Sequence, residues 1–483
     1  MPYAGDPGDD GLPTGMNSVV GRDVFAYSLG YFNGDYSAIN NTVALNDSRD
    51  KLWDRTLENV NNSGLFNGNI SWMTTDLASL GTKDRTKGMQ AMMYRYDQLH
   101  RITKGRSLTT YSATNGFTVR PTISAYDEDY TYDANGNILS LNRNDDAATL
   151  KDDFGYDYYT NSNKLKNVKA TQTQNYEYDA IGNLIKDVDE GTIISWTPYG
   201  KIRTVHKGDS ITVSYRYDAA GNRVEKKVAK DSIITVTNYL RDASGNVMSI
   251  YKDTVATEVP IYGSSRLGLY KGGVAEGLRI LGKRNFELSN HLGNVLVVIS
   301  DQVGFKQDSV WATVLSSSDY YPFGLEMKGR TLSDTTYRYG FNGKEKDNSF
   351  ASTTDYDYGF RIYNPEIGKF LSTDPLTKKY AMLTPYQFAS NTPITSIDLD
   401  GLESLITIKG SWWKSQINQA LNDKDMEKAT LLAFKAMSTT LDDISDPKSK
   451  AYARKNWNGN SPATYNWSEK NQNGLTVVFE GED

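Results

Sequence analysis

Apolar and polar residues alternate in short runs along much of the chain, a pattern that predicts β-strands rather than helices. In one such run, the rings of Tyr130 and Tyr132 flank a polar residue and fall on one face of a strand. Asp133 follows and opens a turn by binding its own downstream backbone, and Gly136 provides the positive φ of a tight hairpin. One hairpin cannot bury its apolar face alone, so the pattern predicts hairpins that stack edge to edge.

The same hairpin returns along the chain. From Asp133 on, if the weaker copies YDYYTNSNKL (156–165) and WTPYGKIRTV (196–205) are counted, the interval is about twenty residues, the length of two strands and two turns. The copies read YRYDQLHRI (94–102), YTYDANGNIL (130–139), YEYDAIGNLI (176–185), YRYDAAGNRV (215–224) and, more degenerate, YLRDASGNVM (239–248). Repeats of this kind bury a continuous face only when neighbours stack.

Residues 286–402 have a different character and contain five motifs in a fixed order. They are ELSNHLGNVLVVISD (287–301), DYYPFGLEM (319–327), YRYGFNGKEKD (337–347), YDYGFRIYNPEIGKFLSTDPL (356–376) and TPYQFASNTPITSIDLDGLES (384–404).

The hairpin repeats resemble the YD repeats of Rhs proteins, teneurins and toxin-complex C components, and the resemblance covers residues 94–402. The ordered motifs resemble the Rhs-repeat-associated core domain of Bacteroidetes-type Rhs proteins. The resemblance implies a mainly β fold, in which stacked YD-repeat hairpins form a curved or shell-like sheet, with a small α+β C-terminal domain. The expected divisions are an upstream β segment (1–92), the YD-repeat sheet (93–285), the core domain (286–402) and a variable C-terminal domain, a possible toxin (403–483).

Composition narrows the chemistry. The chain has no Cys and three His, which excludes thiolate zinc sites and Cys nucleophiles and leaves few candidates for a Ser-His-Asp triad. His291 is a candidate general base, but its strand-turn context favours a hydrogen-bonded structural histidine. The net charge of −6 argues against a protein that coats nucleic acid. No cofactor and no metal are predicted for the shell.

The resemblance also implies self-cleavage by an Arg and a pair of carboxylates that act like an aspartic protease. The family's Arg falls on Arg361 and one Asp on Asp374, and the expected scissile bond joins Leu402 to Glu403. Two carboxylates that share a proton let one act as base on water while the other protonates the amide.

The sequence departs from the family at two positions, since Ile362 stands where a second catalytic Asp can occur and Asn364 replaces the Asp of YDP. The second carboxylate must then come from elsewhere, and the candidates are Asp355, Asp357 and Asp398. The alternative is that Arg361 and Asp374 form a buried ion pair that closes the shell without any chemistry.

The segment after residue 402 predicts two helices, 411–421 and 425–441, and a short strand at 475–480. It has no His and no Cys, which excludes a His-Asn-His nuclease, a zinc deaminase and a papain-like peptidase there. Carboxylates that could bind Mg²⁺ (Asp442, Asp443 and Asp446) and cations that could bind phosphate (Arg454 and Lys455) remain possible. The favoured interpretation of Asp442 and Asp443 is a solvated helix end. The activity of this segment is not assigned.

Two functions follow. The first is a shell that encloses or presents a variable effector domain and releases it by self-cleavage, with that domain, an immunity protein or a longer Rhs chain as partners. The second is a non-enzymatic secreted or surface scaffold for adhesion or intercellular recognition. Neither includes nucleic-acid binding by the shell or a transmembrane segment. The start of the chain has no visible signal peptide, so export through a secretion apparatus is expected.

Overall fold

A computed structural model describes residues 24–32, 35, 56–57, 60–61, 64–77, 88–108, 111–112, 116–117, 125–169, 174–272, 280–306, 309–332, 337–349, 354–378, 383–402 and 405–406. The two helices and the strand predicted after residue 402, and the acidic and basic candidates there, lie outside these residues. Every regular element described, apart from two single 3-10 turns, is a β-strand, which confirms the mainly β class.

Two large antiparallel sheets account for most of the chain. The first has seven strands, in the order β1 (Phe25–Gly30), β4 (Trp72–Leu77), β5 (Met89–Tyr96), β6 (Ile102–Leu108), β9 (Glu128–Tyr132), β10 (Ile138–Asn144) and β11 (Leu150–Gly155). The second has fourteen in sequence order: β14 (Tyr176–Tyr178), β15 (Leu184–Asp187), β16 (Thr192–Trp196), β17 (Ile202–Lys207), β18 (Ile211–Tyr217), β19 (Arg223–Lys230), β20 (Ile233–Arg241), β21 (Val247–Lys252), β22 (Val255–Tyr262), β23 (Arg266–Lys271), β24 (Arg284–Ser289), β25 (Val295–Lys306), β26 (Ser309–Tyr320) and β27 (Glu326–Leu332).

Small sheets complete the described chain. They contain β2 (Thr56–Leu57) with β3 (Val60–Asn61), β7 (Tyr111–Ser112) with β8 (Gly116–Phe117), β12 (Asp157–Tyr158) with β13 (Leu165–Asn167), the four strands β28 (Glu345–Asp347), β29 (Asp355–Asp357), β30 (Ile362–Asn364) and β31 (Lys369–Phe370), and β32 (Ser396–Ile397) with β33 (Leu405–Ile406). The 3-10 turns are η3 (Phe341–Gly343) and η4 (Ala389–Asn391).

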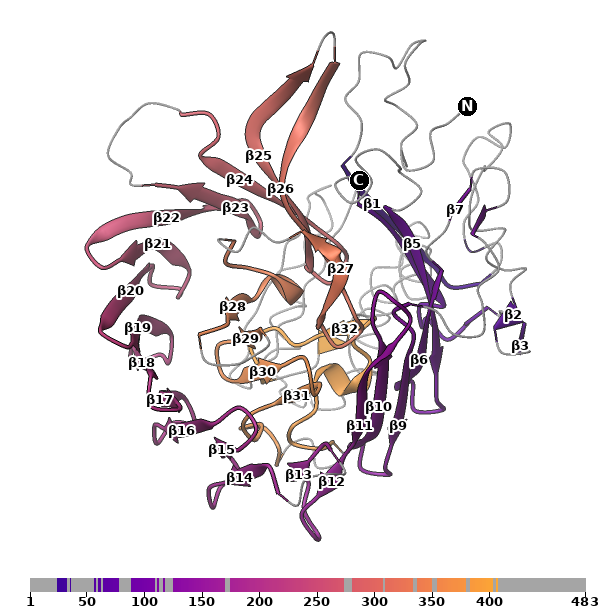
Figure 1. Cartoon of the computed structure of the whole chain (residues 1–483), viewed down its shortest axis with the longest axis horizontal. Coiled ribbons are helices and arrows are strands. Elements are labelled where there is room, and N and C mark those ends of the chain that lie inside the picture. The colour runs from indigo at the N-terminus through magenta and orange to yellow at the C-terminus, as the bar shows by residue number, and fades with distance from the viewer. Residues whose placement is uncertain are drawn as a thin grey trace, which may run out of the picture.

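The two large sheets curve around the four-stranded sheet, which lies in the middle of the ring (Figure 1). We call residues 337–402 the plug and the two large sheets, joined by β12 and β13, the shell wall. The fourteen-stranded sheet runs without a break through residues 285–286, where the sequence predicts the start of a core domain. The division into domains therefore stays a prediction.

The curvature has a local cause in the repeated hairpins. A register shift occurs at or beside the second aromatic position of the Y-x-Y unit in successive hairpins, for example at Arg95/Tyr96, Glu177/Tyr178 and Arg216/Tyr217. An extra residue of this kind bends a strand and increases its twist. Because the bend recurs in successive hairpins, the sheet curves as a whole.

The second aromatic side chain of several hairpins also ties that hairpin to the one before it. Tyr132 Oη donates to the carbonyl of Ile102 at 2.7 Å, and Trp196 Nε1 donates to the carbonyl of Leu184 at 2.7 Å. The first Tyr of the unit is buried on the inner face, as Tyr130 is. The tyrosines of the repeats therefore have two roles: they pack on the inner face, and they hydrogen-bond neighbouring hairpins to one another.

The turn residues behave as the sequence predicts. Asp179 Oδ1 accepts hydrogen bonds from the backbone N–H of Ile181, Gly182 and Asn183, and its Oδ2 accepts from Asn183 Nδ2. Gly182 has φ +99°. Each turn is thus closed by its own carboxylate.

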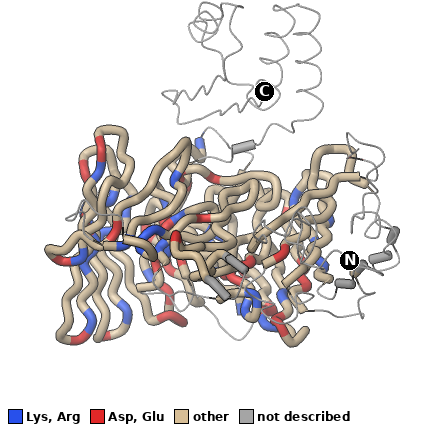
Figure 2. Tube along the Cα trace, turned by 90° about the horizontal axis from the view of Figure 1, so that it is seen from above, with Lys and Arg blue, Asp and Glu red and all other residues tan. Residues whose placement is uncertain are grey.

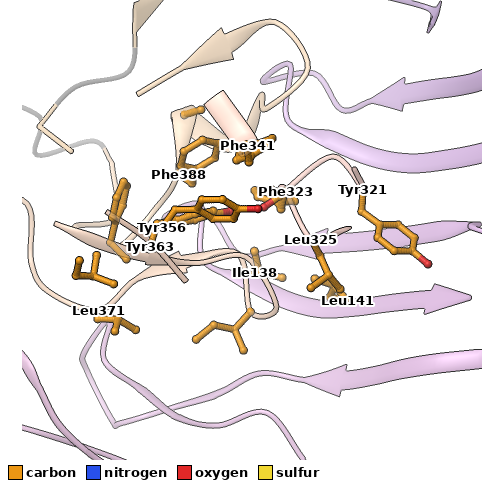
Figure 3. Close-up of a cluster of buried hydrophobic side chains, with 14 of the residues drawn as sticks. Ile138, Leu141, Tyr321, Phe323, Leu325, Phe341, Tyr356, Tyr363, Leu371 and Phe388 are labelled. Carbon is orange, nitrogen blue, oxygen red and sulfur yellow. The ribbon is translucent and has the colours of Figure 1, made fainter. Parts of the chain in front are cut away.

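The principal apolar core lies where the plug meets the wall (Figure 3). The rings of Tyr363 and Phe388, both fully buried, lie 4.4 Å apart, and Tyr363 Oη donates to the carbonyl of Phe323 at 2.8 Å. The wall contributes Ile138 and Leu141 to the same cluster. The plug is therefore packed as a protein interior and is part of the fold.

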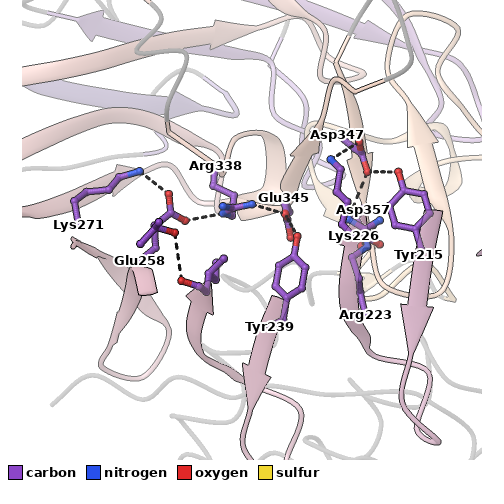
Figure 4. Close-up of polar contacts among 12 residues, drawn as sticks. Tyr215, Arg223, Lys226, Tyr239, Glu258, Lys271, Arg338, Glu345, Asp347 and Asp357 are labelled. Carbon is purple, nitrogen blue, oxygen red and sulfur yellow. Dashed lines mark hydrogen bonds and ion pairs between the residues drawn. The ribbon is translucent and has the colours of Figure 1, made fainter. Parts of the chain in front are cut away.

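Charged side chains join the plug to strands β18 and β19 of the wall (Figure 4). Buried Asp347 of the plug binds Lys226 at 2.8 Å, lies 3.4 Å from Arg223, and accepts a hydrogen bond from Tyr215 Oη. Positive and negative residues are interspersed along the chain trace (Figure 2). Asp347, Lys226 and Arg223 are thus paired with one another, as burial of charge requires.

Among the described residues, the two large sheets share no strand pairing at the junction where β26 and β27 lie beside β4 and β5. Side chains close this junction. Arg330 pairs with Asp319 at 2.6 Å and donates to the carbonyl of Gly88 at 2.9 Å, while Thr75 Oγ1 donates to Asp319 at 3.2 Å. Polar contacts thus join the two sheets here, beside an apolar cluster in which Leu77 of β4 packs with Leu296 and Val297 of β25.

Candidate active site

Arg361 lies in the turn between β29 and β30, and its guanidinium is buried against the face of the Phe370 ring, 3.7 Å from the ring centre. An arginine in such surroundings stays protonated and needs anionic or carbonyl partners. The structure provides both kinds.

Two carboxylates converge on a single nitrogen of this arginine. Arg361 Nη2 lies 3.0 Å from Asp374 Oδ2 and 3.1 Å from Asp398 Oδ2. Because both oxygens contact the same atom, the two carboxylates are close neighbours. The structure thus brings Arg361 and Asp374 together and adds one of the three candidates for the second carboxylate, Asp398.

Local hydrogen bonds orient each carboxylate. Asp374 Oδ1 accepts from the backbone N–H of Leu376 at 2.7 Å, which leaves Oδ2 directed to the arginine. Asp398 Oδ1 accepts from the N–H of Gly401 at 2.6 Å. Both side chains are therefore held in place by turns of their own backbone.

Burial changes the acidity of both groups. It raises the pKa of Asp398 to about 6, although the Arg361 guanidinium acts in the opposite direction. Burial also raises the pKa of Asp374, which is the more exposed of the two, again against the effect of Arg361. Burial thus favours the protonated form of each carboxyl, and Arg361 favours the ionised form.

The same residues line a pocket together with Leu402, Pro385 and Thr377. Its free space is about 30 Å³, and a water molecule needs about 10–15 Å³. The expected scissile residue Leu402 is buried in this pocket. The geometry thus places a carboxylate pair, an arginine, room for water and the end of the core segment together.

The segment that leads to Leu402 is fixed by a glycine and by strand pairing. Gly401 has φ +87°, and a Cβ there would lie 2.9 Å from the backbone N of Arg361. Beyond Leu402, β33 pairs antiparallel with β32 in the register Ser396↔Ile406. Glu403 lies outside the described residues.

The other two candidates for the second carboxylate have different partners. Asp357 pairs with Arg223 of the wall at 2.9 Å. Asp355 is opposite Asp347 in the plug sheet, and burial raises its pKa well above the usual range. Neither contacts Arg361, so neither is placed to share its chemistry. The alternative expectation of a buried ion pair between Arg361 and Asp374 is also met by this geometry.

His291 is hydrogen-bonded in a turn, as expected: its Nε2 lies 2.9 Å from the carbonyl oxygen of Ile394, and its ring stacks on Tyr27. Within the described ranges, no group of three or more His, Asp or Glu is arranged to hold a metal ion. The described part of the chain also has no helix long and apolar enough to cross a membrane.

The sequence missed Lys344, whose ammonium donates to the carbonyl of Leu399 close to the carboxylates. It also missed Asp400, whose charge acts on Arg361 and on both carboxylates. Lys344 stands in the quoted motif YRYGFNGKEKD, but nothing in local spacing links it to a segment 55 positions away. Asp400 and Asp398 are both part of DLDGL (398–402), and the sequence alone does not distinguish the roles of these two aspartates.

A family model described as the teneurin YD-shell matches residues 110–241, the hairpins of the shell wall. The chain therefore contains a YD-shell region. Among curated proteins, it is 24% identical to toxin subunit YenC2 of Yersinia entomophaga over 70% of this chain and 36% of that protein. It is 30% identical to salivary gland surface protein 1 of Aedes aegypti over 51% of this chain and 7% of that protein, and 26% identical to the tRNA nuclease WapA of Bacillus subtilis over 56% and 11%.

Solved structures resemble this chain in fold. The Photorhabdus luminescens Tc holotoxin pore matches with a TM-score of 0.52 and 19% identity, over 73% of this chain and 17% of that chain. The TcdB2–TccC3 crystal structure matches with a TM-score of 0.51 and 18% identity, over 70% and 17%. The chain thus spans about a third of the toxin subunit and a sixth of the solved chains.

Proposed function

We propose that this YD-shell segment encloses or presents the chain that follows it as an effector, and that its plug cuts the chain after Leu402. The observation that supports cleavage most directly is the convergence of Asp374 and Asp398 on Arg361 beside Leu402. Acid–base hydrolysis can use one carboxylate as the base and a second as the acid, and the site beside Leu402 provides both.

The roles follow from burial. Asp398, the more deeply buried carboxyl, holds the proton, and Asp374 is ionised. Asp374 takes a proton from water as its oxygen bonds to the carbonyl carbon of Leu402. Asp398 gives its proton to the amide nitrogen of Glu403, and the C–N bond breaks. The products are a carboxyl at Leu402 and an amine at Glu403. The proton taken from water ends on Asp374, and Asp398 is left ionised, so the pair still holds one proton.

The second carboxylate in this mechanism belongs to the segment that is cut. Asp398 lies on the same strand-to-loop segment as Leu402, whereas Asp374 belongs to the body of the plug. This arrangement compensates for Ile362, where a family member can have an Asp. Cleavage would then be intramolecular, and the chain would need to fold before it could cut.

The test is cell-free synthesis of the full chain, followed over time on denaturing gels. We expect Asp374→Asn and Asp398→Asn to slow cleavage by at least about 100-fold, since each removes one partner of the acid–base pair. Asp357→Asn is the matched control, because Asp357 was an equal candidate by sequence and pairs with Arg223 instead. Cleavage that survives Asp374→Asn would overturn the proposal.

The pH dependence gives a second test of the roles. Because Asp398 must be protonated and its pKa is about 6, cleavage should slow as pH rises above about 6. It should also slow in strong acid, where Asp374 takes up a proton and no longer acts as base. Synthesis at pH 5.5–8.5 measures the fall in cleavage rate above pH 6, which we call the upper limb of the pH profile. A rate that keeps increasing through pH 8 would contradict this assignment.

The effector role rests on the relatives. Two curated relatives are named as toxin subunits and two as tRNA nucleases, and the described shell curves around its own plug. We infer export through a secretion apparatus, a separate domain at 403–483 and an immunity protein as a partner. Comparing bacterial growth on expression of the full chain with growth on expression of a chain ending at Leu402 tests this. Equal growth would favour a scaffold.

A further inference from the structure

The segment before the expected scissile bond is held at three successive carbonyl groups. The carbonyl of Leu399 accepts from Lys344 Nζ, that of Asp400 accepts from the backbone N–H of Phe360 at 2.8 Å, and that of Gly401 accepts from Arg361 Nε. The three donors come from two different parts of the plug. A backbone gripped at consecutive residues has little freedom to slide.

Among the three donors, Lys344 is the one charged side chain to which the proposed mechanism gives no part. It follows η3, is partly buried, and its Nζ lies 5.0 Å from the centre of the Tyr358 ring. Its ammonium acts on Asp398, Asp400 and Asp357. The proposed mechanism uses Arg361 and two aspartates, and it leaves this cation without a role.

We propose that Lys344 is a positioning residue for self-cleavage, which fixes the register of residues 399–401 and sets the proton affinity of Asp398 through its charge. This inference rests on the self-cleavage proposed above. Its two parts are separable, because a hydrogen bond to a carbonyl and a positive charge can be removed independently.

The charges that face Asp398 come from every part of the site. Arg361 and Lys344 favour its ionised form, whereas Asp400 on its own segment and burial favour the protonated form. Asp374 lies across the shared arginine nitrogen. Removing the Lys344 cation should therefore raise the pKa of Asp398 and move the upper pH limb of cleavage upward by about one unit.

The experiment compares four variants of the full chain by cell-free synthesis across pH 5.5–8.5, with mass spectrometry of the products. Lys344→Gln keeps a donor for Leu399 and loses the charge, so we expect the limb to move up and the cut to stay after Leu402. Lys344→Met loses both, so the limb should move and cutting should be slower by about tenfold or spread to neighbouring bonds. Lys344→Arg should restore the wild-type limb.

Lys369→Met is the matched control, since Lys369 is a buried lysine of the plug whose Nζ lies over the rings of Tyr156 and Tyr158. It should leave the limb unchanged. A Lys344→Gln limb identical to wild type, beside an inactive Asp374→Asn, would overturn this inference alone. An uncleaved wild type, or a cleaving Asp374→Asn, would overturn self-cleavage and this inference with it. If Lys344→Met fails to fold, the upper limbs of Lys344→Gln and Lys344→Arg still test whether the Lys344 charge acts on Asp398.

Discussion

Enclosure between wall and plug shifts acids and bases in opposite directions. Burial raises the pKa of Glu128 to about 8, although Arg143 acts against it, and Tyr130 Oη donates to its carboxyl at 2.7 Å. Burial lowers the pKa of Lys369 to about 7. In both cases the neutral form is favoured, because water is excluded and no opposite charge fully compensates.

Glu128 makes stability depend on pH in a defined direction. Its pKa in the folded state, about 8, lies above the ordinary value of 4.5. Its contribution is therefore complete below pH 4.5 and is lost as pH rises through 8. We expect Glu128→Gln, which stays neutral, to lose less stability than wild type between pH 6 and pH 9 in urea unfolding. An equal loss in both proteins would contradict the assignment. Glu177→Gln, at a half-exposed pair with Lys186, is the control.

Much of the wall could be predicted from the sequence because each hairpin contains its own instructions. The Asp, Gly and Asn of a turn are neighbours in the chain, and the alternation of Tyr130 and Tyr132 fixes which face is buried. The site could be predicted only in part. Asp355, Asp357 and Asp398 were equivalent by sequence, and only packing of distant segments directs one of them to Arg361.

At the scale of the elements, the turns of the wall also serve as contact points for the plug. The carbonyl of Gly182 accepts from Tyr386 Oη at 2.7 Å. A Cβ at Gly182 would lie 2.6 Å from the Tyr386 hydroxyl oxygen and 2.6 Å from Thr373 Cγ2. The turn is therefore constrained both by its positive φ and by a neighbour from the plug.

A pair of glycine substitutions separates the two constraints. Gly191 also has positive φ, at +60°, but a Cβ there meets nothing within 4 Å. Gly191→Ala should cost about 1–2 kcal/mol for the left-handed conformation alone. Gly182→Ala should cost a further ~1–3 kcal/mol because it forces the turn away from the plug. Thermal unfolding measures both, and equal losses would show that the contact with the plug is not tight.

At the scale of the whole molecule, the ring of strands is closed at one junction by side chains rather than by strand pairing. Arg330 is central there, since it binds Asp319 from the same sheet and the carbonyl of Gly88 from the other. Its ion pair is almost wholly buried. A shell that depends on one junction is expected to open there first.

Removing that arginine should therefore loosen the shell. Arg330→Met leaves the Asp319 charge buried without its main partner, and we expect a loss of about 3–5 kcal/mol and faster limited proteolysis. Arg216→Met, at an exposed pair with Glu225, should cost less than about 1 kcal/mol. Similar losses in the two variants would mean that the junction does not hold the ring closed.

The central claim is that the folded chain cuts itself after Leu402, and the intact mass of the purified full-length protein tests it most directly. In proportion to their share of 483 residues and 53.9 kDa, residues 1–402 and 403–483 have masses of about 45 and 9 kDa. We expect these two species from wild type, with Leu402 at the new C-terminus, and one species of about 54 kDa from Asp374→Asn. A single uncut wild-type species, or the same two fragments from Asp374→Asn, would contradict it.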